Sequence, residues 1–338
     1  MLYYPLIFLI SYIGTFIFYI TKFFEVHDVP NHRSMHVIPT KKSAGIIFIS
    51  VFILSVLFGQ WSGLFNLAQI NILIVGLAFC MILGLIDDRF DVSSGKKMFL
   101  EYAMFLILFY IFPIHFSIFS YNFYSQNPVH LILLTTYVTF IINLCNFMDG
   151  LDLYLSATLI MAIINLFLVS NSMDVSIAHL FYFLIASIFG FIIFNFPPAK
   201  LFMGDAGSLP LGFFIALMPL FLGENKLNSE LSVIILIIPI FIIDGISTIL
   251  FRLFKKENIF KAHRLHLYQR ISLHYWNKLF TSISFSIANI IFVFFYLQLI
   301  NRKIGHEFAS IVSFLVFEII YIFIYRYILK YNILNTQI

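Results

Sequence analysis

Charged side chains are scarce in this 338-residue chain: only 11% of its residues are Asp, Glu, Lys or Arg. Soluble domains carry roughly 25% charged residues, so this chain cannot cover a globular surface with water-compatible side chains. The shortage excludes a soluble enzyme, a nucleic-acid-binding module and a disordered protein. Cysteine is also rare. Cys80 and Cys145 both lie in apolar runs, which excludes a disulfide framework and a cysteine-rich metal site.

Apolar residues make up 61% of the chain, and its mean hydropathy is +0.99. A helix needs about 20 mostly apolar residues to cross a bilayer, with some latitude. Eleven stretches qualify, near 2–20, 43–59, 69–86, 98–112, 130–145, 153–170, 177–194, 207–223, 231–252, 278–300 and 307–329. The sequence therefore predicts an all-α, polytopic integral membrane protein with about 11 transmembrane helices.

The basic residues indicate how the chain is oriented. Sixteen of the 20 Lys and Arg residues fall in alternate loops between the expected spans or in the tail after residue 325. Because Lys and Arg concentrate in cytoplasmic loops, we expect these loops inside, the N-terminus outside and the C-terminus cytoplasmic. No linker or repeat divides the chain, which we interpret as one domain, 1–338.

The pair Asp87-Asp88 closes an expected span at its C-terminal end, on the cytoplasmic face. The helix dipole disfavours negative charge there by a few tenths to about 1 kcal/mol. A divalent cation or a cationic group of a substrate would relieve that cost. The alternative is a solvated helix end with Arg89 as counter-ion, and spacing alone does not decide between the two.

A second polar cluster repeats every third residue through Asn143, Asn146, Asp149 and Asp152. A three-residue step drifts around a 3.6-residue helix, so we expect Gly150 to break the helix and let the group converge. Amide and carboxylate oxygens are hard donors that suit Mg²⁺. A polar loop with asparagine caps is the alternative, but the density of oxygen donors favours a functional cluster.

A third motif, Gly-Asp-Ala-Gly-Ser at 204–208, precedes another expected span. Glycines allow a ligand to approach the backbone, and the N-terminus of the following helix offers free N–H groups to an anion. Asp205 or Ser208 could instead simply cap that helix.

A fourth motif contains His263, Arg264 and His266. These side chains suit phosphate oxygens better than zinc, because no thiolate or third ligand lies nearby in sequence. A basic loop resting on anionic lipid headgroups is the alternative. Inside an expected span, Asp244 is costly as an ion and could pair with Arg252, two turns later.

Taken together, the cytoplasmic face carries paired carboxylates, oxygen donors for a metal and phosphate-binding cations. This combination predicts Mg²⁺-assisted phosphoryl transfer between a soluble nucleotide substrate and a lipid. No P-loop pattern is present, which argues against an ATP-driven pump. A transporter would need polar groups near the bilayer midplane, whereas here the carboxylates lie at one surface.

With these motifs in this order, the chain resembles the polyprenyl-phosphate N-acetylhexosamine-1-phosphate transferases, glycosyltransferase family 4. The resemblance covers about residues 31–270, and the joint match is specific although each motif alone is not. The matching motifs are Arg33-Ser34-x-His36-x-x-Pro39-Thr40, Asp87-Asp88 with Lys97 downstream, Asn143-x-x-Asn146-x-x-Asp149-Gly150-x-Asp152, Gly204-Asp205-x-Gly207-Ser208 and His263-Arg264-x-His266-x-Tyr268-Gln269.

The resemblance implies an enzyme of the bacterial inner membrane that transfers N-acetylhexosamine-1-phosphate from a UDP-sugar to undecaprenyl phosphate and releases UMP. Asp87, Asp88 and Asp205 would be catalytic, and Asn146 and Asp205 would hold Mg²⁺, with Mn²⁺ as an alternative. The residues implied in substrate binding are Lys97, Asn143, Asp149, Asp152, His263, Arg264 and His266. A homodimer stays open, and no nucleic acid is expected as a partner.

The chain departs from the family pattern after Asp152, where Leu153-Tyr154-Leu155 replaces the usual Gly-Leu-Ala. Its fourth motif resembles the branch that initiates O-antigen and other surface glycans, not the three consecutive histidines of the peptidoglycan-precursor branch. We therefore expect UDP-GlcNAc or a 6-deoxy relative such as UDP-FucNAc as donor. The alternatives are a phospho-N-acetylmuramoyl-pentapeptide transferase-type activity, a lipid or solute transporter, and a catalytically dead scaffold.

The charge of the acceptor bears on the mechanism. A phosphate monoester is largely ionised at pH 7, since its second pKa is about 6, so strong base catalysis is unnecessary. We expect the lipid phosphate to attack the donor's β-phosphorus directly, with a covalent aspartyl-phosphate route as the alternative.

Overall fold

The computed structural model describes residues 2–22, 24–31, 34–64, 70–118, 121–170, 175–221, 231–257 and 264–335. Helices dominate these residues. They are α1 (Tyr3–Ile20), α2 (Gly45–Trp61), α3 (Ile70–Phe90), α4 (Ser94–Ile111), α5 (Pro128–Met148), α6 (Tyr154–Val169), α7 (Val175–Asn195), α8 (Asp205–Phe221), α9 (Ile234–Ile237), α10 (Pro239–Phe254), α11 (Leu267–His274), α12 (Lys278–Asn301) and α13 (His306–Asn335). Four short strands accompany them: β1 (His27–Asp28), β2 (Thr40–Lys41), β3 (His115–Ile118) and β4 (Tyr121–Tyr124).

Each expected apolar span coincides with a helix to within a few residues, apart from the span at 231–252, which is divided. Six described helices are long and apolar enough to cross a membrane. The helical membrane architecture is thus confirmed, while the count of 11 spans and the orientation of the termini stay predictions. Two small antiparallel ribbons, β1–β2 and β3–β4, are the departures from an all-α chain.

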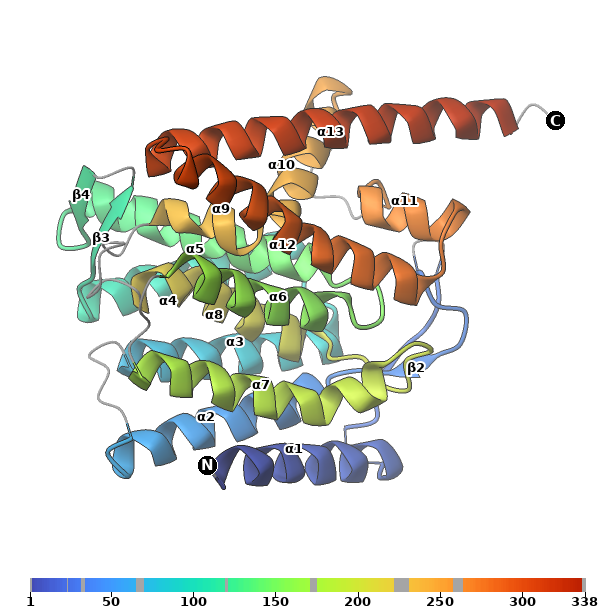
Figure 1. Cartoon of the computed structure of the whole chain (residues 1–338). Coiled ribbons are helices and arrows are strands. Elements are labelled where there is room, and N and C mark those ends of the chain that lie inside the picture. The colour runs from blue at the N-terminus through green and yellow to red at the C-terminus, as the bar shows by residue number, and fades with distance from the viewer. Residues whose placement is uncertain are drawn as a thin grey trace.

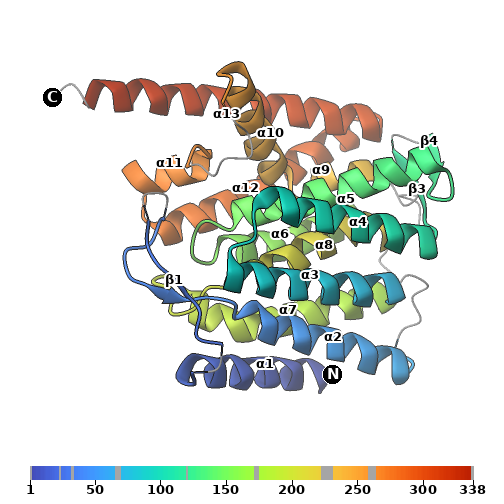
Figure 2. The ribbon, with the colours of Figure 1, turned by 180° about the vertical axis from the view of Figure 1, so that it is seen from behind.

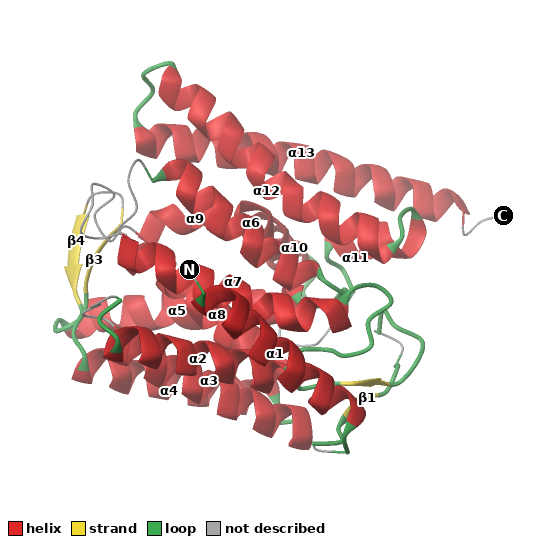
Figure 3. Ribbon diagram, turned by 60° about the horizontal axis from the view of Figure 1, so that its bottom comes forward, coloured by secondary structure: helices red, strands yellow, loops and turns green. Residues whose placement is uncertain are grey.

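Most of the long helices run side by side, so the bundle has two distinct ends (Figure 1). The β3–β4 ribbon lies at one end. The β1–β2 ribbon and α11 lie at the other, and the view from behind shows the same division (Figure 2). Figure 3 shows α8 lying among other helices. Residues 206–220 of α8 are all buried, as expected for a helix that is apolar on every side.

Glycines bring the backbones of α2 and α3 against the start of α8. A Cβ on Gly45 would lie 2.2 Å from the backbone nitrogen of Gly207, and one on Gly84 would lie 2.2 Å from the carbonyl oxygen of Asp205. Only residues without a side chain permit such contact. The C-terminal end of α3 and the N-terminal end of α8 therefore meet at the end of the bundle that carries β1, β2 and α11.

Two asparagines stabilise a break between α9 and α10, at Ile238. Asn165 Nδ2 donates to the carbonyl oxygens of Leu236 (3.2 Å) and Ile237 (3.3 Å). Asn289 Oδ1 accepts from the backbone N–H of Ile240 at 3.1 Å. Side chains of neighbouring helices thus pair backbone groups that a break in an apolar environment would otherwise expose. The break lets α10 run across the direction of the other long helices (Figures 1 and 2).

Asn289→Ala is expected to lower the melting temperature of the detergent-solubilised protein. The change leaves the buried N–H of Ile240 without its partner, which costs about 1–3 kcal/mol. Asn301→Ala, at the exposed end of the same helix, is the matched control and should leave the melting temperature nearly unchanged. Equal melting temperatures for the two variants would contradict this account of the break.

Candidate active site

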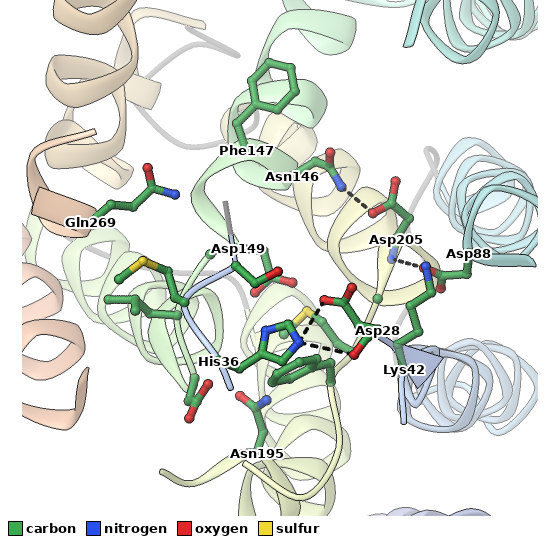
Figure 4. A pocket seen from close by; sticks show the side chains of 18 of the residues that line it. Asp28, His36, Lys42, Asp88, Asn146, Phe147, Asp149, Asn195, Asp205 and Gln269 are labelled. Carbon is green, nitrogen blue, oxygen red and sulfur yellow. Dashed lines mark hydrogen bonds and ion pairs between the residues drawn. The ribbon is translucent and has the colours of Figure 1, made fainter. Parts of the chain in front are cut away.

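The carboxylates singled out in the sequence meet around one cavity of about 630 Å³. It lies where the C-terminal ends of α3 and α5 meet the N-terminal end of α8 (Figure 4). The predicted site residues that line it are Asp88, Asn146, Asp149, Asp152, Asp205 and His266. The structure therefore brings these six predicted residues together at one end of the bundle, and their functional roles stay predictions.

Lys97 connects two of the predicted catalytic carboxylates. Its Nζ lies 2.6 Å from Asp205 Oδ2 and 3.0 Å from Asp87 Oδ2, and the side chain is buried. Charge-assisted hydrogen bonds of this kind are roughly twice as strong as neutral ones. One ammonium group from the start of α4 thus ties the end of α3 to the start of α8.

Asp88 serves as the N-terminal cap of α8, although it belongs to α3. Its oxygens accept from the backbone N–H groups of Asp205 (3.2 Å) and Ala206 (3.3 Å) and from Ser43 Oγ (2.7 Å). The positive end of the α8 dipole therefore offsets the cost of a carboxylate at the end of α3. This cap replaces the one that the sequence suggested, in which Asp205 or its neighbour Ser208 would cap the helix.

The backbone around Asp88 is shaped to admit it. Gly204 adopts φ +65°, and a Cβ there would lie 2.3 Å from Asp88 Oδ2. Ser43 also has a positive φ, +72°, which costs a non-glycine residue roughly 1–2 kcal/mol. The hydrogen bond from Ser43 Oγ to Asp88 holds Ser43 in this conformation, and the missing Cβ of Gly204 leaves room for the carboxylate.

Asn146 links α5 to the same group. Its Nδ2 donates to Asp205 Oδ1 at 2.9 Å and to Ser208 Oγ at 2.8 Å, and Figure 4 shows the first of these bonds. Because the amide nitrogen is used in this way, the oxygen is the atom that Asn146 can offer to a cation.

Asp149 lines the cavity directly after α5. Burial raises the pKa of its carboxyl from 3.8 to about 8, with a smaller contribution from the neighbouring carboxylates Asp205, Asp88 and Asp152. Its proton is therefore retained near neutral pH until positive charge enters the cavity.

Asn143 and Asp152 make contacts that support the surrounding structure. Asn143 Nδ2 donates to the buried Glu101 at 2.6 Å, and Asn143 is not among the residues that line the cavity. Asp152 borders the cavity but lies 3.4 Å from Lys278 Nζ and accepts from the N–H of Ala199 at 3.1 Å. Their expected role in substrate binding stays a prediction.

The position after Asp152 departs from the family pattern, which has a glycine there. Leu153 takes that position with φ +69°, the left-handed conformation that glycine favours. Its N–H donates to Asn195 Oδ1 at 2.7 Å. This contact to the end of α7 holds a leucine where a glycine would be less strained.

The fourth motif reaches the cavity through His266. Arg264 lies nearby and donates to the carbonyl oxygen of Ser34 at 3.5 Å, whereas His263 lies outside the described residues. The suggested pair of Asp244 with Arg252 is wrong: Asp244 bonds His266 at 3.2 Å, and Arg252 lies 3.4 Å from Glu257. The reason is that the chain returns to α10 at the start of α11, which brings His266 and the N–H of Leu267 against Asp244.

Sequence reasoning missed Lys42. Its Nζ lies 3.6 Å from Asp88 Oδ1 and borders the cavity (Figure 4). The neighbouring Lys41 instead donates to the carbonyl oxygens of Phe18 (2.6 Å) and Thr21 (2.9 Å) at the end of α1, and burial lowers the pKa of its ammonium group. The basic pair was visible in the sequence, but only packing decides which lysine enters the cavity.

Comparison with known proteins identifies the chain. The profile of Glycosyl transferase family 4 matches residues 70–223. A "Probable undecaprenyl-phosphate N-acetylglucosaminyl 1-phosphate transferase" of Bacillus subtilis is 30% identical over 254 residues, which is 72% of this chain and 69% of the relative. The chain belongs to glycosyl transferase family 4. It is therefore a membrane-integral sugar-phosphate transferase.

Relatives with a second kind of name match a similar share of this chain. The phospho-N-acetylmuramoyl-pentapeptide-transferase of Listeria welshimeri is 30% identical over 250 residues, covering 67% of this chain and 74% of the relative. The enzyme of the same name from Staphylococcus carnosus is 30% identical over 266 residues, covering 71% and 78%. Both kinds of relative are transferases of phosphorylated sugars, so their names leave the donor of this chain open.

Lys42→Met is expected to lower transferase activity at least about tenfold with an unchanged melting temperature, because it removes a cation that faces the carboxylates of the cavity. The neighbouring substitution, Lys41→Met, is the matched control. It removes two hydrogen bonds to carbonyl oxygens of α1 and should lower the melting temperature instead. Activity assays and thermal unfolding of both variants check the assignment, and a reversed pattern would contradict it.

The raised pKa of Asp149 predicts how stability depends on pH. Between pH 3.8 and about 8 the folded protein keeps a proton that the unfolded chain has lost, so stability falls as the pH rises through this range. Asp149→Asn should flatten the curve. Melting temperatures measured in EDTA from pH 5 to 8.5 check this, with the exposed Asp91→Asn as control. An unchanged slope in Asp149→Asn would rule out the assignment.

Proposed function

We propose that this transferase moves N-acetylhexosamine-1-phosphate from a UDP-sugar to undecaprenyl phosphate, giving undecaprenyl-diphosphate-sugar and UMP. The observation that carries the proposal is the bridge Asp87–Lys97–Asp205, which Asn146 extends at the edge of one large cavity. Such a cluster of carboxylates with a buried ammonium group suits a reaction between two phosphorylated substrates. The reaction would take place at the cytoplasmic face of a bacterial inner membrane and initiate a surface glycan such as O-antigen.

The donor we favour is a simple one, UDP-GlcNAc or a 6-deoxy relative such as UDP-FucNAc. The name of the Bacillus subtilis relative supports an N-acetylglucosaminyl donor. The fourth motif supports it as well, since His263-Arg264-x-His266 lacks three consecutive histidines. The second candidate is a phospho-N-acetylmuramoyl-pentapeptide transferase activity, which relatives of that name support.

The donor set fits Mg²⁺, or Mn²⁺ as an alternative. Asn146 and Asp205 offer hard oxygen atoms, and Asp149 lies nearby on the same cavity. Within the described residues no group of three or more His, Cys, Asp and Glu side chains forms a preassembled metal site. Mg²⁺ commonly binds through one or two carboxylates together with substrate phosphates, so a small protein ligand set is compatible with this metal. The metal would neutralise charge on the donor diphosphate.

The residues of the chain would orient the two substrates. An oxygen of the lipid phosphate attacks the β-phosphorus, the bond from that phosphorus to the bridging oxygen breaks, and UMP leaves with the electron pair. Lys42, which borders the cavity, supplies positive charge where two anions must approach each other, while Lys97 holds Asp87 and Asp205 in place. Asp88 is a poor nucleophile, because both its oxygens accept hydrogen bonds from Ser43 or from backbone amides of α8. This disfavours an aspartyl-phosphate intermediate at Asp88, and we favour direct attack by the phosphate.

The decisive experiment measures UMP release by the purified protein with undecaprenyl phosphate, Mg²⁺ and a panel of UDP-N-acetylhexosamines. We expect turnover with a simple donor and its loss in Asp205→Ala, with folding retained. Asp91→Asn, a carboxylate exposed at the end of α3, should keep full turnover. If no donor gives UMP, the proposal is wrong. A phosphorylated protein trapped without acceptor lipid would refute direct attack.

A further inference from the structure

Asp244 of α10 is fully buried, and one of its oxygens gathers several donors. Oδ1 accepts from Tyr321 OH at 2.8 Å, from the backbone N–H of Leu267 at 3.1 Å and from Thr248 Oγ1 at 3.2 Å, and it lies 3.2 Å from His266 Nδ1. Three elements, α10, the start of α11 and α13, thus converge on a single carboxylate oxygen.

This arrangement is a poor one for stability alone. The second oxygen, Oδ2, is buried without a hydrogen-bond partner among the described residues. A buried polar atom without a partner costs free energy, and a buried carboxylate costs more. Oδ1 meanwhile collects more donors than it has lone pairs. The carboxylate of Asp244 is therefore oriented toward His266 and the start of α11, although this leaves Oδ2 without a hydrogen bond among the described residues.

The contact determines the state and position of the His266 ring. A carboxylate oxygen only accepts, so Nδ1 carries the proton that is donated to Asp244. The bond to the N–H of Leu267 fixes the backbone directly after the ring. On its other side the ring stacks with Tyr268, with centroids 5.8 Å apart and planes 24° apart. His266 itself lines the cavity, so the orientation of its ring determines which atoms it presents to a ligand there.

We propose that Asp244 is a positioning residue, which holds His266 in the ring orientation that binds the diphosphate of the nucleotide substrate. Tyr321 of α13 helps to hold Asp244 through its hydrogen bond to Oδ1, although it lies far outside the segment that carries the motifs. The proposal rests on the proposed function, because it assumes that a nucleoside diphosphate occupies the cavity.

The test is a double-mutant cycle that combines Asp244→Asn with His266→Ala. Asparagine keeps the shape of the side chain but removes the charge. Partners that orient a binding residue typically contribute 10–100-fold, so Asp244→Asn should raise KM for the UDP-sugar about tenfold or more. In the His266→Ala background the same change should have almost no further effect, because the group that it positions is absent. Effects that multiply in the double mutant would overturn the proposal.

Glu318→Gln is the matched control. Glu318 is a partly buried carboxylate of α13 that bonds Ser247 of α10, so it lies between the same two helices that Asp244 joins but bonds a serine and not His266. It should leave KM unchanged. Tyr321→Phe is the milder probe if Asp244→Asn folds poorly. Tyr321→Phe should raise KM two- to fivefold in the wild-type background and leave it unchanged in the His266→Ala background. If KM stays unchanged in the wild-type background, or rises equally in both backgrounds, the result contradicts the proposal.

A binding measurement separates this proposal from the proposed function. UDP should raise the melting temperature of the wild-type protein, because a ligand that binds only the folded state stabilises it. Asp244→Asn and His266→Ala should each weaken that rise, and the double mutant should match His266→Ala. If UDP binds with this pattern but no UMP is released, only the proposed reaction fails. If UDP does not stabilise the wild type, both proposals fail.

Discussion

The carboxylate of Asp88 accepts the first two backbone N–H groups of α8, and the candidate active site is built around this contact. It requires the end of α3 to touch the start of α8, which Gly84 and Gly204 allow by leaving no Cβ in the way. The same contact places Asp87 and Asp205 close enough for Lys97 to bridge them. A negative charge at the end of one helix and the positive end of another dipole thus stabilise each other.

Around this contact, cations and carboxylates alternate. Lys42 lies beside Asp88, and Lys97 lies between Asp87 and Asp205, while Asp149 has no hydrogen-bond donor at its carboxyl among the described residues. The cavity is thus lined by several carboxylates and by a lysine, Lys42, that is paired with one of them. The buried Lys97 holds two further carboxylate contacts together behind that lining.

Much of the fold followed from hydropathy, because an apolar run of about 20 residues has few alternatives to a helix in a bilayer. The break at Ile238 did not, since it depends on Asn165 and Asn289 from other helices. The β3–β4 ribbon also escaped prediction, as its strands are only four residues each. Within the site, the topology predicts that Asp87, Asp88 and Asp205 lie on one face of the membrane, whereas their contacts depend on how α3, α4 and α8 pack.

By itself the sequence determined which residues lie on the same face and which chemistry they offer, because hydropathy and positive charge set the topology and motif residues lie at helix ends. Tertiary structure decided which partner each one has. Lys41 and Lys42 are adjacent and chemically equal, yet one caps α1 and the other enters the cavity. Asp244 bonds His266, although Arg252 is nearer in the chain. Such choices depend on how the helices and the segments between them pack, and side-chain contacts over long sequence separations leave no periodic pattern in the sequence.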